Sequence, residues 1–348
     1  MTDIRLSFAM TPYDRMLPLI NGEVKPDGIT LDYIGMPGAV PRVFYEQIKF
    51  QRYDVSEMSL SSFLRMRSIG WPYLMLPVFN NRNFSYTYIH IRKNSGIRQG
   101  HPEDLKGKRF GIPDYQQTMG LWTRGILQME FGIKPEDMVW YQERGEHFSH
   151  TGASAEAGLE LPKTVELHYA KTDFNTMYLR GELDATAGLG IRLGGGGAFS
   201  SGIDRSRASL PENPDIVTLF PDPRKEAIRF FKKTGIYPPH HTTVVRESIL
   251  AEHPWVAISL MEAFEESKRI AIERLRQLPP TLMVFGQLYL KELDEVFGPD
   301  PFPYGIKANT EAFDMAQTFS VQQGLTERKQ PLEEIFPQEV IYREERLP

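Results

Sequence analysis

The segment from Asp104 to Leu127 constrains the fold of this chain more than any other. It reads DLKGKRFGIPDYQQTMGLWTRGIL, and within it Arg109 to Ile112 is a short β-prone run that Pro113 ends. Apolar residues at helical spacing follow Thr118. A strand that leads into a polar helix N-terminus predicts an α/β unit. It also predicts an anion site, because unpaired backbone N–H groups and the helix dipole face the loop. The alternative is a well-capped helix without a ligand.

Length and composition favour a globular α/β protein whose partners are small molecules. The 348 residues are enough for two lobes with cores of their own. A net charge of −5 without a basic block argues against nucleic acid or a membrane as the main partner. The absence of cysteine excludes disulfides, thiolate metal sites and a cysteine nucleophile. The N-terminus, MTDIRLSFAM, lacks a secretory signal or a long apolar run, so we expect a cytoplasmic protein. Assembly into a homo-oligomer is left open.

Hydrophobic periodicity and turn residues place further strands and helices along the chain. We expect strands at residues 4–9, 29–34, 53–58, 84–91, 110–112, 165–168, 185–187, 216–220 and 242–246, and helices at 43–50, from 118 onward and over 254–278.

One pattern occurs in both halves of the chain. A helix, a turn with aspartate and a short buried strand occur at Tyr53-Asp54-Val55 and again at Leu183-Asp184-Ala185. Because open α/β sheets bind ligands outside the carboxyl ends of their strands, this repetition favours two lobes that face each other across a cleft. Chance is the alternative, since the pattern is common. The first lobe would comprise residues 1–88, the second lobe 89–240, and residues 241–348 would return to the first lobe and add C-terminal helices.

Several segments, in a fixed order, carry a resemblance to a known family. They are YDR (13–15), YDVSEMSLSSFLRMR (53–67), DLKGKRFGIPDYQQT (104–118), WTRGIL (122–127), LFPD (219–222), KTGI (233–236), PPHHT (238–242) and HPWVA (253–257). In these the chain resembles the 4,5-dihydroxyphthalate decarboxylase family, from about Leu6 to Leu278. The resemblance implies the two-lobed α/β fold of type 2 periplasmic binding proteins. It also implies a cofactor-independent carboxy-lyase for a hydroxylated aromatic carboxylate, in aromatic-compound catabolism such as phthalate degradation.

The chain departs from the family pattern at two places. Where the family has an arginine and a histidine after Arg82, this chain has Ser85 and Tyr86, and Pro239-His240 replaces Ile-Met before His241. If the family's arginine grips a substrate carboxylate, this protein acts on something other than a dihydroxyphthalate. The alternative function is a small-molecule binding protein of the same fold without catalysis. A proton donor at His241 favours the enzyme.

Decarboxylation of a hydroxylated ring requires a base, an acid and a site for carboxylates, and in principle no cofactor. His241 matches a family histidine and is the expected acid–base residue, because imidazole exchanges protons near neutral pH. His240 would point to the other side of an extended strand. Glu57 is the second catalytic candidate. Partial burial would raise its pKa and make it a base, unless it forms a salt bridge with Arg15 or Arg65.

The remaining candidates would bind the substrate. Arg82 and Arg192 follow expected strands, and the fork of an arginine matches a carboxylate. Asp14 is expected to orient Arg15 or to cap a helix. Hydroxyl and amide donors complete the expected substrate site: Ser59, Ser61, Tyr115, Gln117 and Thr118. His147 and His150 give only a weak metal-ligand spacing, so no metal site is expected.

Overall fold

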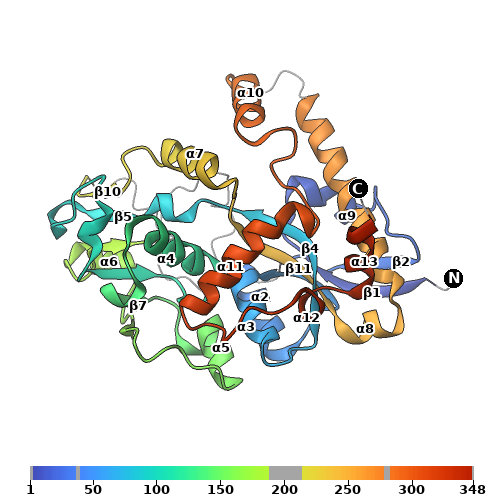
Figure 1. Ribbon diagram of the computed structural model, residues 1–348, viewed down its shortest axis with the longest axis horizontal. Coiled ribbons are helices and arrows are strands. Elements are labelled where there is room, and N and C mark those ends of the chain that lie inside the picture. The colour runs from blue at the N-terminus through green and yellow to red at the C-terminus, as the bar shows by residue number, and fades with distance from the viewer. Residues whose placement is uncertain (1–2, 37–39, 188–213, 278–282, 347–348) are drawn as a thin grey trace.

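The fold consists of two β-sheets surrounded by helices. The computed structural model describes residues 3–36, 40–187, 214–277 and 283–346. One sheet has the strand order β2-β1-β3-β11-β4 and the other the order β10-β5-β9-β6-β7-β8. The two sheets lie side by side in Figure 1, with helices packed on each. This is the two-lobed α/β class expected from the sequence.

The first sheet combines strands that are far apart in the chain. β1 (Ile4–Ala9) pairs in parallel with β2 (Ile29–Tyr33) and β3 (Val55–Ser59). β11 (Pro239–Arg246) inserts antiparallel between β3 and β4 (Tyr73–Arg82). β3 is buried along its whole length, so its polar side chains lie inside the protein.

The second sheet is built from the middle of the chain. Its strands are β5 (His90–Arg92), β6 (Arg109–Ile112), β7 (Val139–Gln142), β8 (Leu167–Tyr169), β9 (Ala185–Thr186) and β10 (Ile216–Thr218). β6, β7, β8 and β9 run parallel, whereas β5 pairs antiparallel with β9 and β10 pairs antiparallel with β5. α4 (Thr118–Phe131) follows β6, which confirms the predicted strand-to-helix unit.

Helices cover both sheets. They are α1 (Leu17–Ile20), α2 (Val40–Phe50), α3 (Leu60–Arg67), α5 (His150–Glu156), α6 (Phe174–Leu179), α7 (Pro223–Thr234), α8 (Glu247–Glu252), α9 (Trp255–Arg276), α10 (Gly286–Phe297), α11 (Thr310–Gln322), α12 (Leu332–Ile335) and α13 (Gln338–Arg346). In Figure 1, α11 crosses the middle of the molecule, and α9 and α10 rise above its body. Within the described residues, no helix is long and apolar enough to cross a membrane.

One expected strand is wrong, and one long strand was missed. The run 84–91 was expected to be β structure, but it holds the 3-10 helix η2 (Ser85–Tyr88) and then the short β5. The missed strand is β4, which precedes η2. It was not predicted because Pro77 in its middle interrupts the β pattern. A proline removes one donor from the strand ladder, which is tolerated here because β4 lies at the sheet edge and, among the described strands, pairs only with β11.

Candidate functional site

Glu57 and His241 form a close pair on neighbouring strands of the first sheet. The Nδ1 of His241 lies 2.5 Å from Oε1 of Glu57. The Glu57 side chain is fully buried, whereas 19% of the His241 side chain is exposed. An ionised carboxylate can only accept, so the shared hydrogen belongs to Nδ1 and the ring's Nε2 remains available. Among the described residues, none forms a hydrogen bond with that Nε2.

Two further groups hold the Glu57 carboxylate from the loop that follows β1. The backbone N–H of Thr11 donates to Oε2 at 3.0 Å, and the Tyr13 hydroxyl donates to Oε1 at 2.8 Å. Burial by itself raises the pKa of the Glu57 carboxyl. The hydrogen bond and charge of His241, with the bonds from Thr11 and Tyr13, outweigh burial and lower the pKa below its ordinary value. The expectation of a raised pKa is therefore wrong, and Glu57 is suited to orient a histidine.

Glu57 also does not form the expected salt bridge with an arginine. The Arg15 guanidinium lies between two aromatic rings, 4.4 Å from the centroid of Tyr13 and 4.0 Å from that of Phe302. Its Nη1 is 3.1 Å from the Asp14 carboxylate, and so Asp14 orients Arg15, one of the two roles expected for it. Arg65 points elsewhere and donates to the side chain of Gln116 and to two backbone carbonyls.

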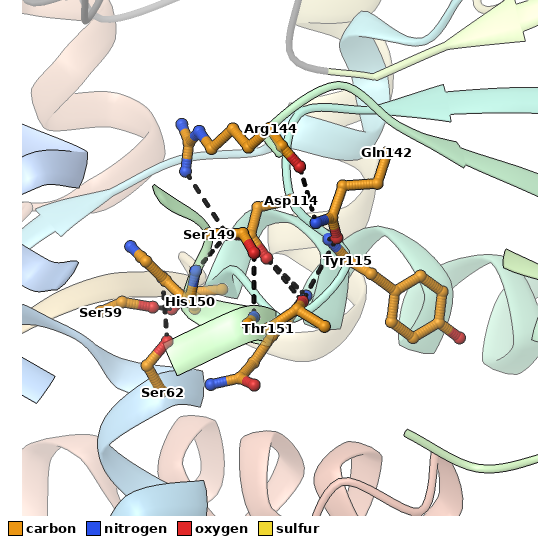
Figure 2. A network of polar contacts seen from close by, with 12 residues as sticks. Ser59, Ser62, Asp114, Tyr115, Gln142, Arg144, Ser149, His150 and Thr151 are labelled. Carbon is orange, nitrogen blue, oxygen red and sulfur yellow. Dashed lines mark hydrogen bonds and ion pairs between the residues drawn. The ribbon is translucent and has the colours of Figure 1, made fainter. Parts of the chain in front are cut away.

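A second polar network is centred on Asp114, in the loop between β6 and α4 (Figure 2). The buried Asp114 carboxylate accepts from the backbone N–H of His150 at 2.6 Å and from the Thr151 hydroxyl at 2.8 Å. The guanidinium of Arg144 lies 3.9 Å away. The His150 ring reaches back to the first sheet's helix α3, where its Nδ1 is 3.0 Å from the Ser62 hydroxyl oxygen. This contact joins elements of the two lobes.

Phe44, from α2, contacts the rings of both histidines. Its ring centroid is 4.9 Å from that of His241 and 5.7 Å from that of His150. Complete burial lowers the pKa of His150 to about 4, so this ring is neutral at pH 7. His241 and His150 thus both pack against one aromatic ring, and of the two only His241 has a carboxylate on its ring nitrogen.

The N-termini of α3 and α4 meet beside this region. The hydroxyl oxygens of Ser59 and Thr118 are 2.9 Å apart, and the backbone N–H of Ser61 donates to the Thr118 hydroxyl at 3.0 Å. The Ser61 hydroxyl and the Nε2 of Gln117 are buried and have no hydrogen-bond partner among the described residues. Two helix N-termini with spare donors favour an anion, because both carry partial positive charge. The structure therefore brings together four of the expected donors.

Two other candidates lie apart from this arrangement. Tyr115 is buried against Arg124, whose guanidinium is 3.7 Å from the ring centroid, and Figure 2 shows the Tyr115 ring turned away from the Asp114 network. Arg82 donates to the carbonyls of Tyr237 and Pro303 and to the Asn309 side chain, so its fork is engaged in packing the C-terminal segment. These placements do not support Tyr115 or Arg82 as substrate ligands.

Three further residues that the sequence singled out are Arg192, Ser85 and Tyr86. Arg192 lies outside the described residues. Ser85 places its hydroxyl 3.5 Å from Nε2 of His240, and the Tyr86 hydroxyl donates to the Glu226 carboxylate at 2.8 Å. The adjacent histidines have different neighbours, because His240 faces Ser85 while the ring of His241 faces Glu57.

Sequence reasoning missed Tyr13, Thr11, Phe44 and His150. Tyr13 had a usable signal, since it stands in the Tyr-Asp-Arg landmark just after a strand end, where α/β sheets place ligand groups. Thr11 contributes a backbone N–H, and Phe44 and His150 meet only through tertiary packing, so no local pattern marks them. In the part of the chain that the structure describes, no group of three or more histidine, aspartate or glutamate side chains could hold a metal ion.

Comparisons with known proteins agree with this architecture. The chain is 33% identical over 343 residues to the 4,5-dihydroxyphthalate decarboxylase of Comamonas testosteroni, which covers 97% of this chain and 98% of that protein. It is 38% identical over 191 residues to a protein of the same name from Pseudomonas putida, covering 54% of this chain and 71% of that one. No family model matches the chain.

Among solved structures, two sulfonate-binding proteins share the fold. The periplasmic aliphatic sulphonate binding protein SsuA from Escherichia coli superposes with a TM-score of 0.52 at 12% identity, over 97% of this chain and 99% of that one. A putative periplasmic sulfonate-binding protein from Methylobacillus flagellatus KT gives 0.55 at 12% identity, over 99% and 94%. At this identity the likeness shows the fold alone, and it confirms the periplasmic-binding-protein-like class.

Proposed function

Since the chain belongs to the 4,5-dihydroxyphthalate decarboxylase family, we propose that it is a carboxy-lyase that releases carbon dioxide from a hydroxylated aromatic carboxylic acid. The observation that carries the proposal is the Glu57–His241 pair, with one ring nitrogen held by a carboxylate and the other available. A binding protein needs donors that hold a ligand, but it has no need for a group that cycles a proton. Degradation of a phthalate-type compound is the process in which this activity would serve.

The proposed reaction follows from the instability of an aryl anion. Direct loss of carbon dioxide would leave that anion, which does not form at neutral pH. If a hydroxyl stands ortho or para to the carboxylate, a base removes its proton and electron density moves to the ring carbon that bears the carboxylate. An acid protonates that carbon, the bond to the carboxylate breaks, and its electron pair restores the aromatic ring. In balance, one proton replaces one carbon dioxide on the ring.

We assign the proton donor for the ring carbon to Nε2 of His241. Glu57 would fix the tautomer and the orientation of the imidazole by accepting from Nδ1, and its buried negative charge would stabilise the ring when it carries a second proton. Tyr13 and Thr11 donate to Glu57 in turn, so the loop that follows β1 holds the pair in place.

The carboxylate group of the substrate is proposed to bind where α3 and α4 meet. Ser61 and Gln117 supply a buried hydroxyl and a buried amide N–H there, and the N-terminus of a helix carries partial positive charge. Ser59 and Thr118 fix the two helix ends to each other. Arg15 and Arg192 remain proposed ligands for a second carboxylate.

The test is a panel of hydroxylated benzoates and phthalates incubated with the purified protein, with released carbon dioxide as the readout. We expect release only from rings that carry a hydroxyl ortho or para to a carboxylate, and no effect of a metal chelator on the rate, because the proposed steps need no metal. Binding should be measured in parallel by calorimetry. A ligand that binds tightly while no member of the panel loses carbon dioxide would favour the alternative, a binding protein like its sulfonate-binding structural neighbours.

A further inference from the structure

A cavity separate from the candidate site lies between β4, α11 and α12. Its volume is about 230 Å³, and among the described residues that line it none belongs to the candidate site. An apolar cavity of about 150 Å³ is already enough to hold benzene. Pockets for larger ligands measure about 300–1,000 Å³. The cavity therefore fits one aromatic ring with a small substituent.

The walls of the cavity are mostly apolar. Three buried phenylalanines line it, namely Phe79 of β4, Phe313 of α11 and Phe336 just after α12. The ring centroids of Phe313 and Phe336 are 5.4 Å apart, and the two rings are inclined by 54°. Ile306 and Leu332 add aliphatic side chains to the lining. Because aromatic rings attract a further ring in edge-to-face or offset contacts, these walls favour an aromatic ligand.

One buried acceptor in the lining has no partner. Gln330 is 3% exposed, and its Oε1 forms no hydrogen bond with any described residue. Its Nε2 donates to the carbonyl of Leu64 at 2.8 Å, and its backbone N–H donates to the side chain of Gln317 at 2.7 Å. Rotation of the amide would bring two oxygens together, so Oε1 stays the unpaired atom. A ligand that donates a hydrogen to this oxygen would therefore be stabilised there.

The charges at the cavity disfavour an anion. Lys329 is the one cation among the described residues that line it, and its Nζ is 2.7 Å from the Asp314 carboxylate, which lines the cavity too. Both side chains are exposed, so this ion pair lies at the mouth. The amide donors of Asn309 and Gln317 are taken by backbone carbonyls. A carboxylate inside would face the Gln330 oxygen without a donor, and so the ligand is expected to be neutral.

We propose that this cavity binds a neutral phenol. The ring would lie among the three phenylalanines, and the hydroxyl would donate to Oε1 of Gln330. One group of the ligand thus satisfies the acceptor that the fold leaves unpaired, while the rest of the ligand is apolar like the walls. The site would exist whether or not the protein is a carboxy-lyase, because the cavity and the candidate site share no described residue.

Calorimetry of the full chain with phenol, toluene and benzoate tests the class of ligand. Phenol should bind about 5-fold more tightly than toluene, since the two have nearly the same shape and differ by one hydrogen bond. Gln330→Leu removes Oε1 and should bind phenol and toluene equally. Equal affinities in the parent would overturn the proposal and leave Oε1 to a water molecule. A preference for phenol that survives in Gln330→Leu would overturn it as well.

A second pair of variants tests the location. Leu332→Trp enlarges a side chain of the lining, so phenol affinity should fall at least about 10-fold, and benzoate binding should not change. Leu332 is 38% exposed, so the fold should persist by circular dichroism. Met129→Trp is the matched control, since Met129 on α4 is 41% exposed and lies outside the lining. Undiminished phenol binding in Leu332→Trp, or an equal loss in the control, would contradict the proposed site.

Discussion

Oε1 of Glu57 accepts two hydrogen bonds at once, from Nδ1 of His241 at 2.5 Å and from the Tyr13 hydroxyl at 2.8 Å. This oxygen thus orients the imidazole of His241 and is itself held in place by the Tyr13 hydroxyl. This distinguishes His241 from His240 and His150, whose ring nitrogens have hydroxyl neighbours at 3.5 and 3.0 Å. A carboxylate in that place is the arrangement that keeps a histidine in one tautomer through a proton-transfer cycle.

The His241→Asn variant should bind substrate and turn it over at least about 100-fold more slowly, the lower range for a lost general acid. Asparagine retains a hydrogen-bonding edge but cannot cycle a proton. In heavy water, the parent should place deuterium on the carbon that lost carbon dioxide. His240→Asn is the control and should keep turnover close to that of the parent. Near-parent turnover of His241→Asn would move the acid role to another group.

Tyr13→Phe should lower turnover by on the order of 10-fold with little change in KM, the effect of one lost hydrogen bond to a charged acceptor. The acidic limb of its pH–rate profile should move to higher pH, because the Tyr13 hydroxyl helps to lower the pKa of Glu57. Tyr53→Phe removes a comparable bond, from the Tyr53 hydroxyl to Glu46 at 3.0 Å, and should leave the pH profile unchanged. Identical profiles for the two variants would show that Tyr13 is only structural.

Arg82→Lys should lower the free energy of unfolding by about 1–3 kcal/mol while KM stays the same. Lysine keeps the charge but cannot donate to Tyr237, Pro303 and Asn309 at once. Urea denaturation and steady-state kinetics give the two quantities. A raised KM at unchanged stability would restore Arg82 as a ligand for a substrate carboxylate.

The stability of the protein should fall between pH 6.5 and about 4 because of His150. The pKa of this ring is lowered to about 4 by burial, so over that range the unfolded chain binds a proton that the folded chain excludes. The loss is at most about 1.4 kcal/mol per pH unit. Glu57, whose pKa is also lowered, stabilises the fold above about pH 4.5 and loses this contribution only at lower pH, as pH falls through its folded-state pKa. His150→Gln should therefore flatten the stability profile above pH 4.5, and an unchanged slope there would contradict the assignment.

The sequence predicted the elements that have strong local signals. The strand-to-helix unit around Pro113 and the first strand, Ile4–Ala9, agree with the structure to within a residue or two. β4 was missed because Pro77 interrupts an edge strand. The lobe boundaries near Ile89 and His240 stay a prediction.

The sequence predicted several residues of the candidate site but not the contacts between them. Glu57 and His241 were both singled out, but their pairing was not, because it depends on the register of two strands 184 positions apart. The same limit explains Arg82. Its forked side chain pointed toward a ligand, whereas two of its three partners, Pro303 and Asn309, come from a segment more than 200 residues later.

The position of β11 in the first sheet determines when that sheet can form during synthesis on the ribosome. In the part of the chain that the structure describes, β11 is the one strand that β4 pairs with, so the nascent chain carries an unpaired strand edge until Pro239–Arg246 has left the exit tunnel. His241 arrives on that same strand, and therefore the first sheet and the Glu57 pair are completed together, late in translation. Contacts of such long sequence separation slow folding and prolong exposure of strand edges. A nascent chain that ends before residue 239 should thus have neither a closed first sheet nor a proton-transfer pair, and should depend on chaperones.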